Sequence, residues 1–176
     1  MINLLLLYLV SLAILLSTIG YGMYFIKITN FNIKQFNLGL VGILGLFFLS
    51  IISSYTHIFF PHNYLHNILI IILGLFYTFF FIKKSNLEIF LELKYILIIF
   101  TLIFICLIIS KTNEDFPYYH LPNSLQFAEQ KLQFGLGNLN HGFKHISSIF
   151  MLMSLNYLPF FKVYLLFLII FILFFL

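Results

Sequence analysis

The sequence predicts an all-helical membrane protein, a polytopic bundle of about five or six transmembrane helices with one extracytoplasmic loop that contains short interfacial helices. Hydrophobic residues make up 62% of the 176 residues and charged residues only 8%, whereas a soluble domain is about half apolar and about a quarter charged. The apolar residues are also gathered in uncharged runs, and a helix needs about 20 mostly apolar residues to cross a bilayer. The bilayer is therefore the expected surroundings of most of this chain.

Residues 1–110 contain four such runs and are predicted to form four transmembrane helices. The first has neither a basic start nor a small-residue cleavage site, so it is expected to remain as a span and not to be removed as a signal peptide. Gly39, Gly42 and Gly45 in the second run are spaced so that a neighbouring helix can approach closely. The four runs are 1–26, 38–60, 64–82 and 95–110, with polar connectors at 27–37 and 83–94.

Residues 146–176 are predicted to form further transmembrane helices. An apolar run over 146–161 is followed by Lys162, and the apolar character then continues from Val163 to the last residue. That last run is too short to span comfortably. The sequence therefore predicts that the chain is the N-terminal part of a longer protein.

The lysines predict the orientation of the bundle, because cytoplasmic connectors carry the excess of basic residues. Five lysines lie in the connectors 27–37 and 83–94, and the turn at Pro61 has none. The N-terminus, the Pro61 turn and the polar segment 111–145 are therefore predicted to be extracytoplasmic. The five lysines are Lys27, Lys34, Lys83, Lys84 and Lys94.

The net charge of +4 and the pI near 9.1 do not predict a nucleic-acid partner. The lysines fall between hydrophobic runs, whereas nucleic-acid binding needs basic residues gathered on one face. Cys106 lies in the middle of an apolar run, where a small buried apolar side chain is the expected role.

The extracytoplasmic segment 111–145 is the candidate functional region, since it is the only extended stretch that water must solvate. Glu114 and Asp115 stand next to each other directly after a span. Adjacent carboxylates and partial burial both raise the proton affinity of one acid, which could then serve as a general base. The alternative is a solvated turn and helix N-cap, a place where acids are also favoured.

The rest of this segment is predicted to contain an interfacial helix over 122–133 and a polar, glycine-rich turn over 134–145. The turn combines glycines with amides and histidines, among them Asn138 and His141, and could cradle a sugar or a phosphate. The same composition is also common in ordinary loops.

Three histidines flank the Pro61 turn: His57, His62 and His66. His62 and His66 are four residues apart, a spacing that can place two imidazoles on one helix face and bind a metal. No cysteine or acid nearby completes a ligand set, so histidines that hydrogen-bond to headgroups or backbone are the preferred interpretation, and no metal site is predicted.

The polar segment resembles the polytopic C-type glycosyltransferases, and more closely a bacterial family of membrane glycosyltransferases that pairs an Asp with a Tyr-His-Leu segment and a later Gly-Leu-x-Asn-Leu segment. The resemblance covers Asp115 to Phe150, and the spans around it match only as hydrophobic helices. It departs from many C-type enzymes in that the acidic loop follows the fourth span instead of the first. The residues that carry it are Asp115-Phe-Pro-Tyr-Tyr119-His120-Leu121-Pro122, Glu129, Lys131, Gly135-Leu-Gly137-Asn138-Leu139 and Ser147-Ser148-Ile-Phe150.

This resemblance implies that the full-length protein transfers a sugar from a polyprenyl-phosphate-linked donor to an envelope glycan, lipid or protein at the outer face of the bacterial plasma membrane. It implies that Asp115 is the base, with Glu114 second, in some members of the superfamily together with a divalent metal ion. By the same resemblance Tyr119 and His120 orient the acceptor or the donor phosphate, and Asn138 and His141 contact the sugar. The expected partners are the lipid bilayer and the lipid-linked donor.

Two alternatives remain open from the residues alone. The chain could be a non-enzymatic component of glycan export, such as a flippase or transporter subunit, whose loop only binds glycan. A transporter is expected to repeat its spans, and the sequence contains no internal repeat. The other alternative is an inactive fragment.

Overall fold

The computed structural model describes residues 3–31, 36–83, 87–109, 116–139, 141–144, 147–166, 168–169 and 172. Every element within these ranges is helical, which confirms the predicted all-α fold class. In chain order the elements are α1 (Leu4–Ile28), α2 (Leu38–Phe59), α3 (Tyr64–Ile82), α4 (Leu87–Ile109), the π-helix η2 (Phe116–His120), α5 (Leu121–Glu129), α6 (Leu136–Leu139), the 3₁₀-helix η3 (His141–Lys144), α7 (Ser148–Leu155) and the 3₁₀-helix η4 (Lys162–Leu165).

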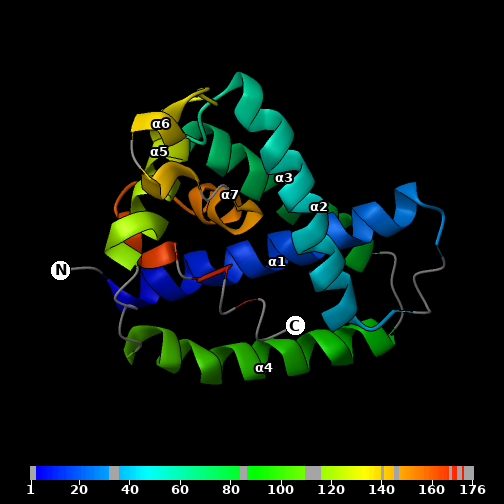
Figure 1. The fold of residues 1–176 in the computed structure, drawn as a ribbon. Coiled ribbons are helices and arrows are strands. Elements are labelled where there is room, and N and C mark those ends of the chain that lie inside the picture. The colour runs from blue at the N-terminus through cyan, green and yellow to red at the C-terminus, as the bar shows by residue number, and fades with distance from the viewer. Residues whose placement is uncertain are drawn as a thin grey trace.

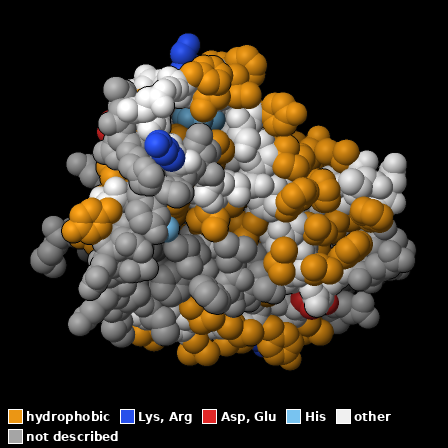
Figure 2. Space-filling model, viewed as in Figure 1, with side chains coloured by type: hydrophobic (Ala, Val, Ile, Leu, Met, Phe, Trp, Pro, Cys, Tyr) orange, Lys and Arg blue, Asp and Glu red, His pale blue; other side chains and the backbone are white. Residues whose placement is uncertain are grey.

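Three of the described helices, α1, α2 and α3, are long and apolar enough to cross a membrane. On α3 the large apolar side chains point outward, and its buried residues are few and small or polar: Asn67, Gly74 and Thr78. Figure 2 shows apolar side chains spread over the face of the molecule where α2 and α3 lie. A surface of this kind is suited to lipid and unsuited to water.

The further spans of the predicted bundle stay predictions. In the predicted run 146–161 the structure describes one helix, α7, of eight residues, which rises only about 12 Å against the roughly 30 Å thickness of the hydrocarbon core. Most of α7 is buried, including Leu152, Met153 and Leu155.

The central helix is α1, and glycines allow both neighbours to approach it closely. A Cβ atom added at Gly45 of α2 would overlap the carbonyl oxygen of Thr18 in α1. On the other side, a Cβ at Gly20 of α1 would overlap the carbonyl oxygen of Gly74 in α3. The close approach expected from the glycines of the second span is therefore confirmed at Gly45, and it is the packing mode that membrane helices favour.

Hydrogen bonds and ring contacts join α1 to α3 and α4. The Thr78 hydroxyl donates to the carbonyl oxygen of Leu16 at 2.6 Å, and the Tyr21 hydroxyl to that of Ile70 at 2.9 Å. The hydroxyls of Tyr8 and Thr101 lie 2.8 Å apart, which ties the start of α1 to the last part of α4. Each of these hydroxyl groups thus has a partner that lipid cannot supply.

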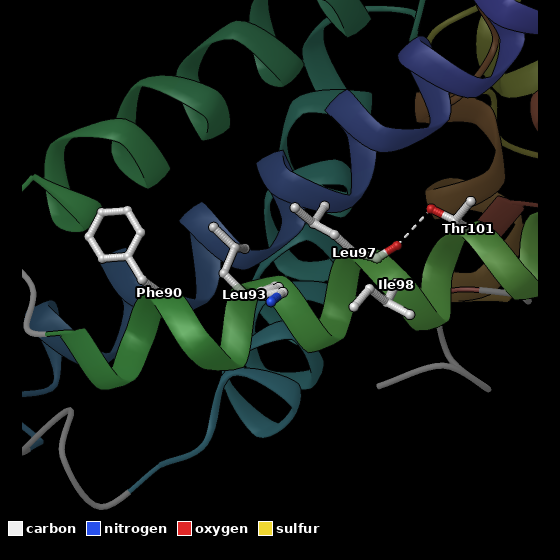
Figure 3. Close-up of a pocket in the computed structure, with 6 residues that line it drawn as sticks. Phe90, Leu93, Leu97, Ile98 and Thr101 are labelled. Atoms are coloured by element: carbon white, nitrogen blue, oxygen red, sulfur yellow. Dashed lines mark hydrogen bonds between the residues drawn. The ribbon is translucent and has the colours of Figure 1, made fainter.

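The predicted connector 83–94 is wrong from Leu87 onward, because α4 begins at Leu87 and not at residue 95. The physical reason lies at Glu92, whose carboxylate accepts a hydrogen bond from the backbone N–H of Leu38 at 2.8 Å. The first N–H groups of a helix lack intrahelical partners and attract negative charge. Glu92 therefore has a structural role: it lies within α4 and its carboxylate caps the start of α2. Figure 3 shows a pocket along α4 on both sides of this position, with the Thr101 hydroxyl bonded to the Leu97 carbonyl. It is lined by Phe90, Leu93, Lys94, Leu97, Ile98 and Thr101.

The short helices gather at one end of α2 and α3. In Figure 1, α5, α6 and α7 lie beside the turn that joins α2 to α3. At the other end of the bundle, the last turns of α1 and α3 lie together, since the Lys27 ammonium is 5.8 Å from the centre of the Phe80 ring. The turn and the polar segment are therefore on one side of the bundle and Lys27 and Lys83 on the other, an arrangement consistent with the predicted orientation.

Candidate functional site

Backbone hydrogen bonds attach the polar segment to the turn between α2 and α3. The N–H of His62 donates to the carbonyl oxygen of Phe127 at 2.8 Å, and the N–H of Leu132 donates to that of His57 at 3.0 Å. The second bond requires an extended chain after α5, and Gln130 is indeed extended, with φ −133° and ψ 146°. For this reason α5 ends at Glu129, and the helix predicted over 122–133 is four residues too long at its end.

The face that α5 buries is more polar than the sequence suggested. Phe127 and Ala128 are buried as expected, but Asn123 and Ser124 are each only 1% exposed. The Ser124 hydroxyl donates to the carbonyl oxygen of His120 at 2.9 Å. This helix therefore packs into protein on one side and is more than an interfacial helix lying on lipid.

The three histidines around the turn form a row of rings. The ring centres of His57 and His62 are 4.9 Å apart, and those of His62 and His66 are 5.0 Å apart with nearly parallel planes. The middle ring, His62, is fully buried, with Nε2 3.1 Å from the carbonyl oxygen of Ser53 and Nδ1 2.6 Å from the hydroxyl oxygen of Ser154. A carbonyl can only accept, so Nε2 carries the proton in the neutral ring. The single proton of the Ser154 hydroxyl has two acceptors within reach, Nδ1 of His62 and the carbonyl oxygen of Met151 at 2.7 Å.

This row is not arranged as a metal site. Both nitrogens of His62 are engaged with protein groups, and its ring stacks on that of His66 instead of converging with it on a common point. Within the part of the chain that the structure describes, no group of three His, Cys, Asp or Glu residues could hold a metal ion. The hydrogen-bonded interpretation is confirmed for the ring of His62, whereas Nδ1 of His57 and Nε2 of His66 are buried without a hydrogen-bond partner.

Burial, with the neighbouring His66 and His57 adding to it, lowers the pKa of His62 to about 3. In an unfolded chain the imidazole takes up a proton below its ordinary pKa of 6.5, while the folded protein holds the ring neutral. The stability that depends on neutral His62 is thus complete above pH 6.5 and declines as the pH falls from there towards 3.

We expect the melting temperature of the purified protein to fall between pH 7 and pH 5, and we expect the His62→Gln variant to show a flatter dependence on pH. A pH profile that is unchanged in the variant would contradict this role of His62.

Asn67 holds the turn and α7 together. This residue is fully buried in the first part of α3, and its amide nitrogen lies 2.8 Å from the carbonyl oxygens of both His62 and Ser154 and 2.9 Å from that of Tyr157. Its amide group thereby donates hydrogen bonds both to the turn and to the last part of α7. Asn67 was not among the residues predicted to be functional, although an amide within a long apolar run is a signal that could have identified it.

We expect Asn67→Asp to destabilise the protein by about 2–4 kcal/mol, because a carboxylate cannot donate and the buried carbonyls would lose their partner. The two side chains have nearly the same shape, so the loss reports the hydrogen bonds and the buried charge. The measurement is thermal unfolding in detergent. The matched control is Asn138→Asp on the exposed surface of α6, which is expected to unfold like the unaltered protein.

Of the residues predicted to form the site, Glu114 and Asp115 lie outside the described residues, as do the side chains of Tyr119 and His141. His120 is half-buried, with its ring edge-on to Phe150 at 4.9 Å between ring centres. The side chain of Asn138 is exposed. The structure therefore places His120 within the packing of η2 against α7, and leaves Asn138 on the surface.

A cavity of about 310 Å³ lies between the end of α2 and the polar segment, near the lower end of the size range of small-molecule sites. This cavity could not be predicted from the sequence, because its walls come from residues far apart in the chain. Its polar lining consists of His57, Asn123, Gln126, Lys131 and Gln133, and its other walls of Phe127, Leu132, Phe134, Gly135, Leu136, Gly137 and Phe143.

The fold defines the class of the protein: an all-helical chain with three helices suited to a bilayer, consistent with a membrane protein, and a layer of short polar helices over one end. Comparisons with protein families, with curated proteins and with solved structures find no match to this chain. Its function must therefore be argued from its own residues.

Proposed function

We propose that this chain is part of a membrane glycosyltransferase that moves a sugar from a polyprenyl-phosphate-linked donor to an acceptor at the outer face of the bacterial plasma membrane. Asp115 is the base that deprotonates the acceptor hydroxyl, and Glu114 is the second candidate. The proposal combines the resemblance of the segment from Asp115 to Phe150 with the way in which the polar segment is held against the bundle.

The observation that carries the proposal is the attachment of the residues that follow the acidic pair. Phe116, the next residue after Asp115, is 5% exposed and packs in a buried cluster with Phe127 and Phe150. A general base contributes only when it is held within hydrogen-bond reach of the proton that it removes. Phe116 holds the start of the described polar segment against the bundle, and the proposal uses this attachment to position the neighbouring base.

A transfer assay tests the proposal. The full-length protein is reconstituted into vesicles with a synthetic polyprenyl-phosphate sugar and a glycan acceptor, and the product is detected by mass spectrometry. The proposal expects a new glycosidic bond. Movement of the lipid-linked sugar across the membrane with no covalent product would instead favour the export alternative, and neither activity would overturn both.

A further inference from the structure

The cavity between the end of α2 and the polar segment has walls with the chemistry of an anion site. Among its described lining residues are one ammonium group, on Lys131, three amides and one imidazole, and none of these lining residues carries a carboxylate. The amides belong to Asn123, Gln126 and Gln133. Such walls offer hydrogen-bond donors and positive charge, which favours a ligand with acceptor oxygens and negative charge.

A second lysine lies at the border of this cavity. A Cβ atom built on Gly137, which lines the cavity, would meet Cγ of Lys144 at 3.0 Å. Figure 2 shows lysine side chains over this end of the molecule, with a histidine surface nearby. Glu129 is exposed on α5 nearby but does not line the cavity. The two lysines therefore impose a positive potential on this opening.

His57 adds a buried polar group to the same wall. Its side chain is only 2% exposed, and Nδ1 has no hydrogen-bond partner. Its ring edge packs against Phe127, with ring centres 4.7 Å apart. A buried imidazole nitrogen without a hydrogen-bond partner lowers the stability of the fold. A ligand in the cavity, or a water molecule bound with it, can supply the missing hydrogen bond.

The cavity lies at the level of the lipid headgroups if α2 and α3 span the bilayer. Both helices end at the turn beside it, and exposed aromatic side chains surround that turn: Tyr55, Phe59, Phe60 and Tyr64. Aromatic residues collect at the membrane interface, where one side of the ring meets hydrocarbon and the other meets water. A ligand at this depth that carries both an anionic and an apolar part is a membrane lipid.

We propose that this cavity binds the phosphate group of an anionic phospholipid headgroup. Lys131 and Lys144 neutralise the phosphate, the amides of Asn123 and Gln133 hydrogen-bond its oxygens, and Phe127 and Leu136 contact the apolar part. The inference requires no sugar transfer and holds whether or not the chain belongs to a transferase.

The test is lipid binding to the purified protein in detergent, followed by native mass spectrometry during titration with phosphatidylglycerol and, separately, phosphatidylcholine. Both lipids carry a phosphate, but choline adds a cation that the two lysines repel. We expect saturable binding of phosphatidylglycerol at one site, weakened about fivefold by Lys131→Gln or by Lys144→Gln and about 25-fold by both together. Lys83→Gln, which removes an exposed lysine at the other end of the bundle, is the matched control and is expected to bind as the unaltered protein does.

Three results would overturn the inference. One is full binding in the double lysine variant with its melting temperature unchanged, and another is an equal loss in the Lys83→Gln control, which would mean unspecific attraction to lipid. The third is displacement of phosphatidylglycerol by millimolar inorganic phosphate, which would make free phosphate the ligand. An Asp115→Asn variant is expected to bind phosphatidylglycerol normally, so failure of the transferase proposal and failure of the lipid site can be told apart.

Discussion

Replacing Asp115 by asparagine in the full-length protein is expected to lower sugar transfer by at least about a hundredfold, the range that a general base contributes. Asparagine keeps the size and most of the hydrogen-bonding geometry of aspartate but cannot take up a proton at neutral pH. The binding of acceptor and donor should therefore change little, while the rate constant for transfer falls. The measurement is the initial rate of product formation in vesicles at saturating substrate.

Two variants serve as controls for Asp115. Glu114→Gln changes the neighbouring acid and is expected to reduce transfer much less, since Glu114 is only the second candidate for the base. Phe116→Leu keeps an apolar side chain in the buried cluster of Phe116, Phe127 and Phe150 and should preserve folding. Because Phe116 anchors the segment next to the base, this variant is expected to lower transfer, but less than Asp115→Asn does. If Asp115→Asn keeps its transfer activity and Glu114→Gln loses it, the base is Glu114. If both variants keep their activity, neither acid is the catalytic base.

Replacing Gly45 by leucine is expected to cost the fold about 3 kcal/mol or more, at the upper end of the range for overpacking. The added atoms would overlap the carbonyl oxygen of Thr18, which belongs to the backbone of α1 and cannot turn aside as a side chain would. The two helices would have to separate, and the buried contacts around Leu15 and Ile19 would loosen with them. For a chain of this length the loss corresponds to a fall in melting temperature of about 10 °C.

Phe47→Leu is the matched control for Gly45→Leu. It places a leucine two positions further along α2, where the native Phe47 side chain is 55% exposed. The melting temperature of this variant is expected to stay within a few degrees of that of the unaltered protein. A Gly45→Leu protein that is as stable as this control would show that α1 and α2 are not packed through Gly45.

The sequence predicts the helical class and the first three long helices well, because each is an uninterrupted apolar run bounded by asparagine caps or polar residues. The predicted spans 38–60 and 64–82 differ from α2 and α3 by no more than one residue. The role of Gly45 was also predictable, since a small residue in an apolar helix has few purposes other than close packing.

The errors arise where a contact distant in the chain decides the local structure. The sequence predicts Glu92 in a polar connector, but Glu92 lies within α4, where its carboxylate accepts a hydrogen bond from the backbone N–H of Leu38. Similarly, α5 stops at Glu129 because Leu132 bonds to His57, which no pattern within residues 122–133 could show. Local periodicity contains no information on such partners.

The same reason explains what the sequence could and could not predict of the candidate site. The three histidines near Pro61 are recognisable as a group in the sequence. The contact of His62 with Ser154 and the bond from Asn67 to the Ser154 carbonyl depend on α7, about ninety residues further along the chain. The cavity likewise joins His57 to side chains of the segment 123–143. Residue types identified the polar segment as the functional candidate, and only the fold showed what it packs against.

The central claim, that the polar segment lies at the outer face of a membrane, is tested most directly by cysteine labelling in intact cells. In a background with Cys106→Ser, single cysteines replace Asn138 on the polar segment and Thr29 at the end of α1, both exposed in the structure. We expect a membrane-impermeant maleimide to label the cysteine at position 138 at once, and the cysteine at position 29 only after the membrane is opened. Labelling of position 29 in intact cells, with position 138 protected until the membrane is opened, would contradict the orientation and the outer-face reaction that depends on it.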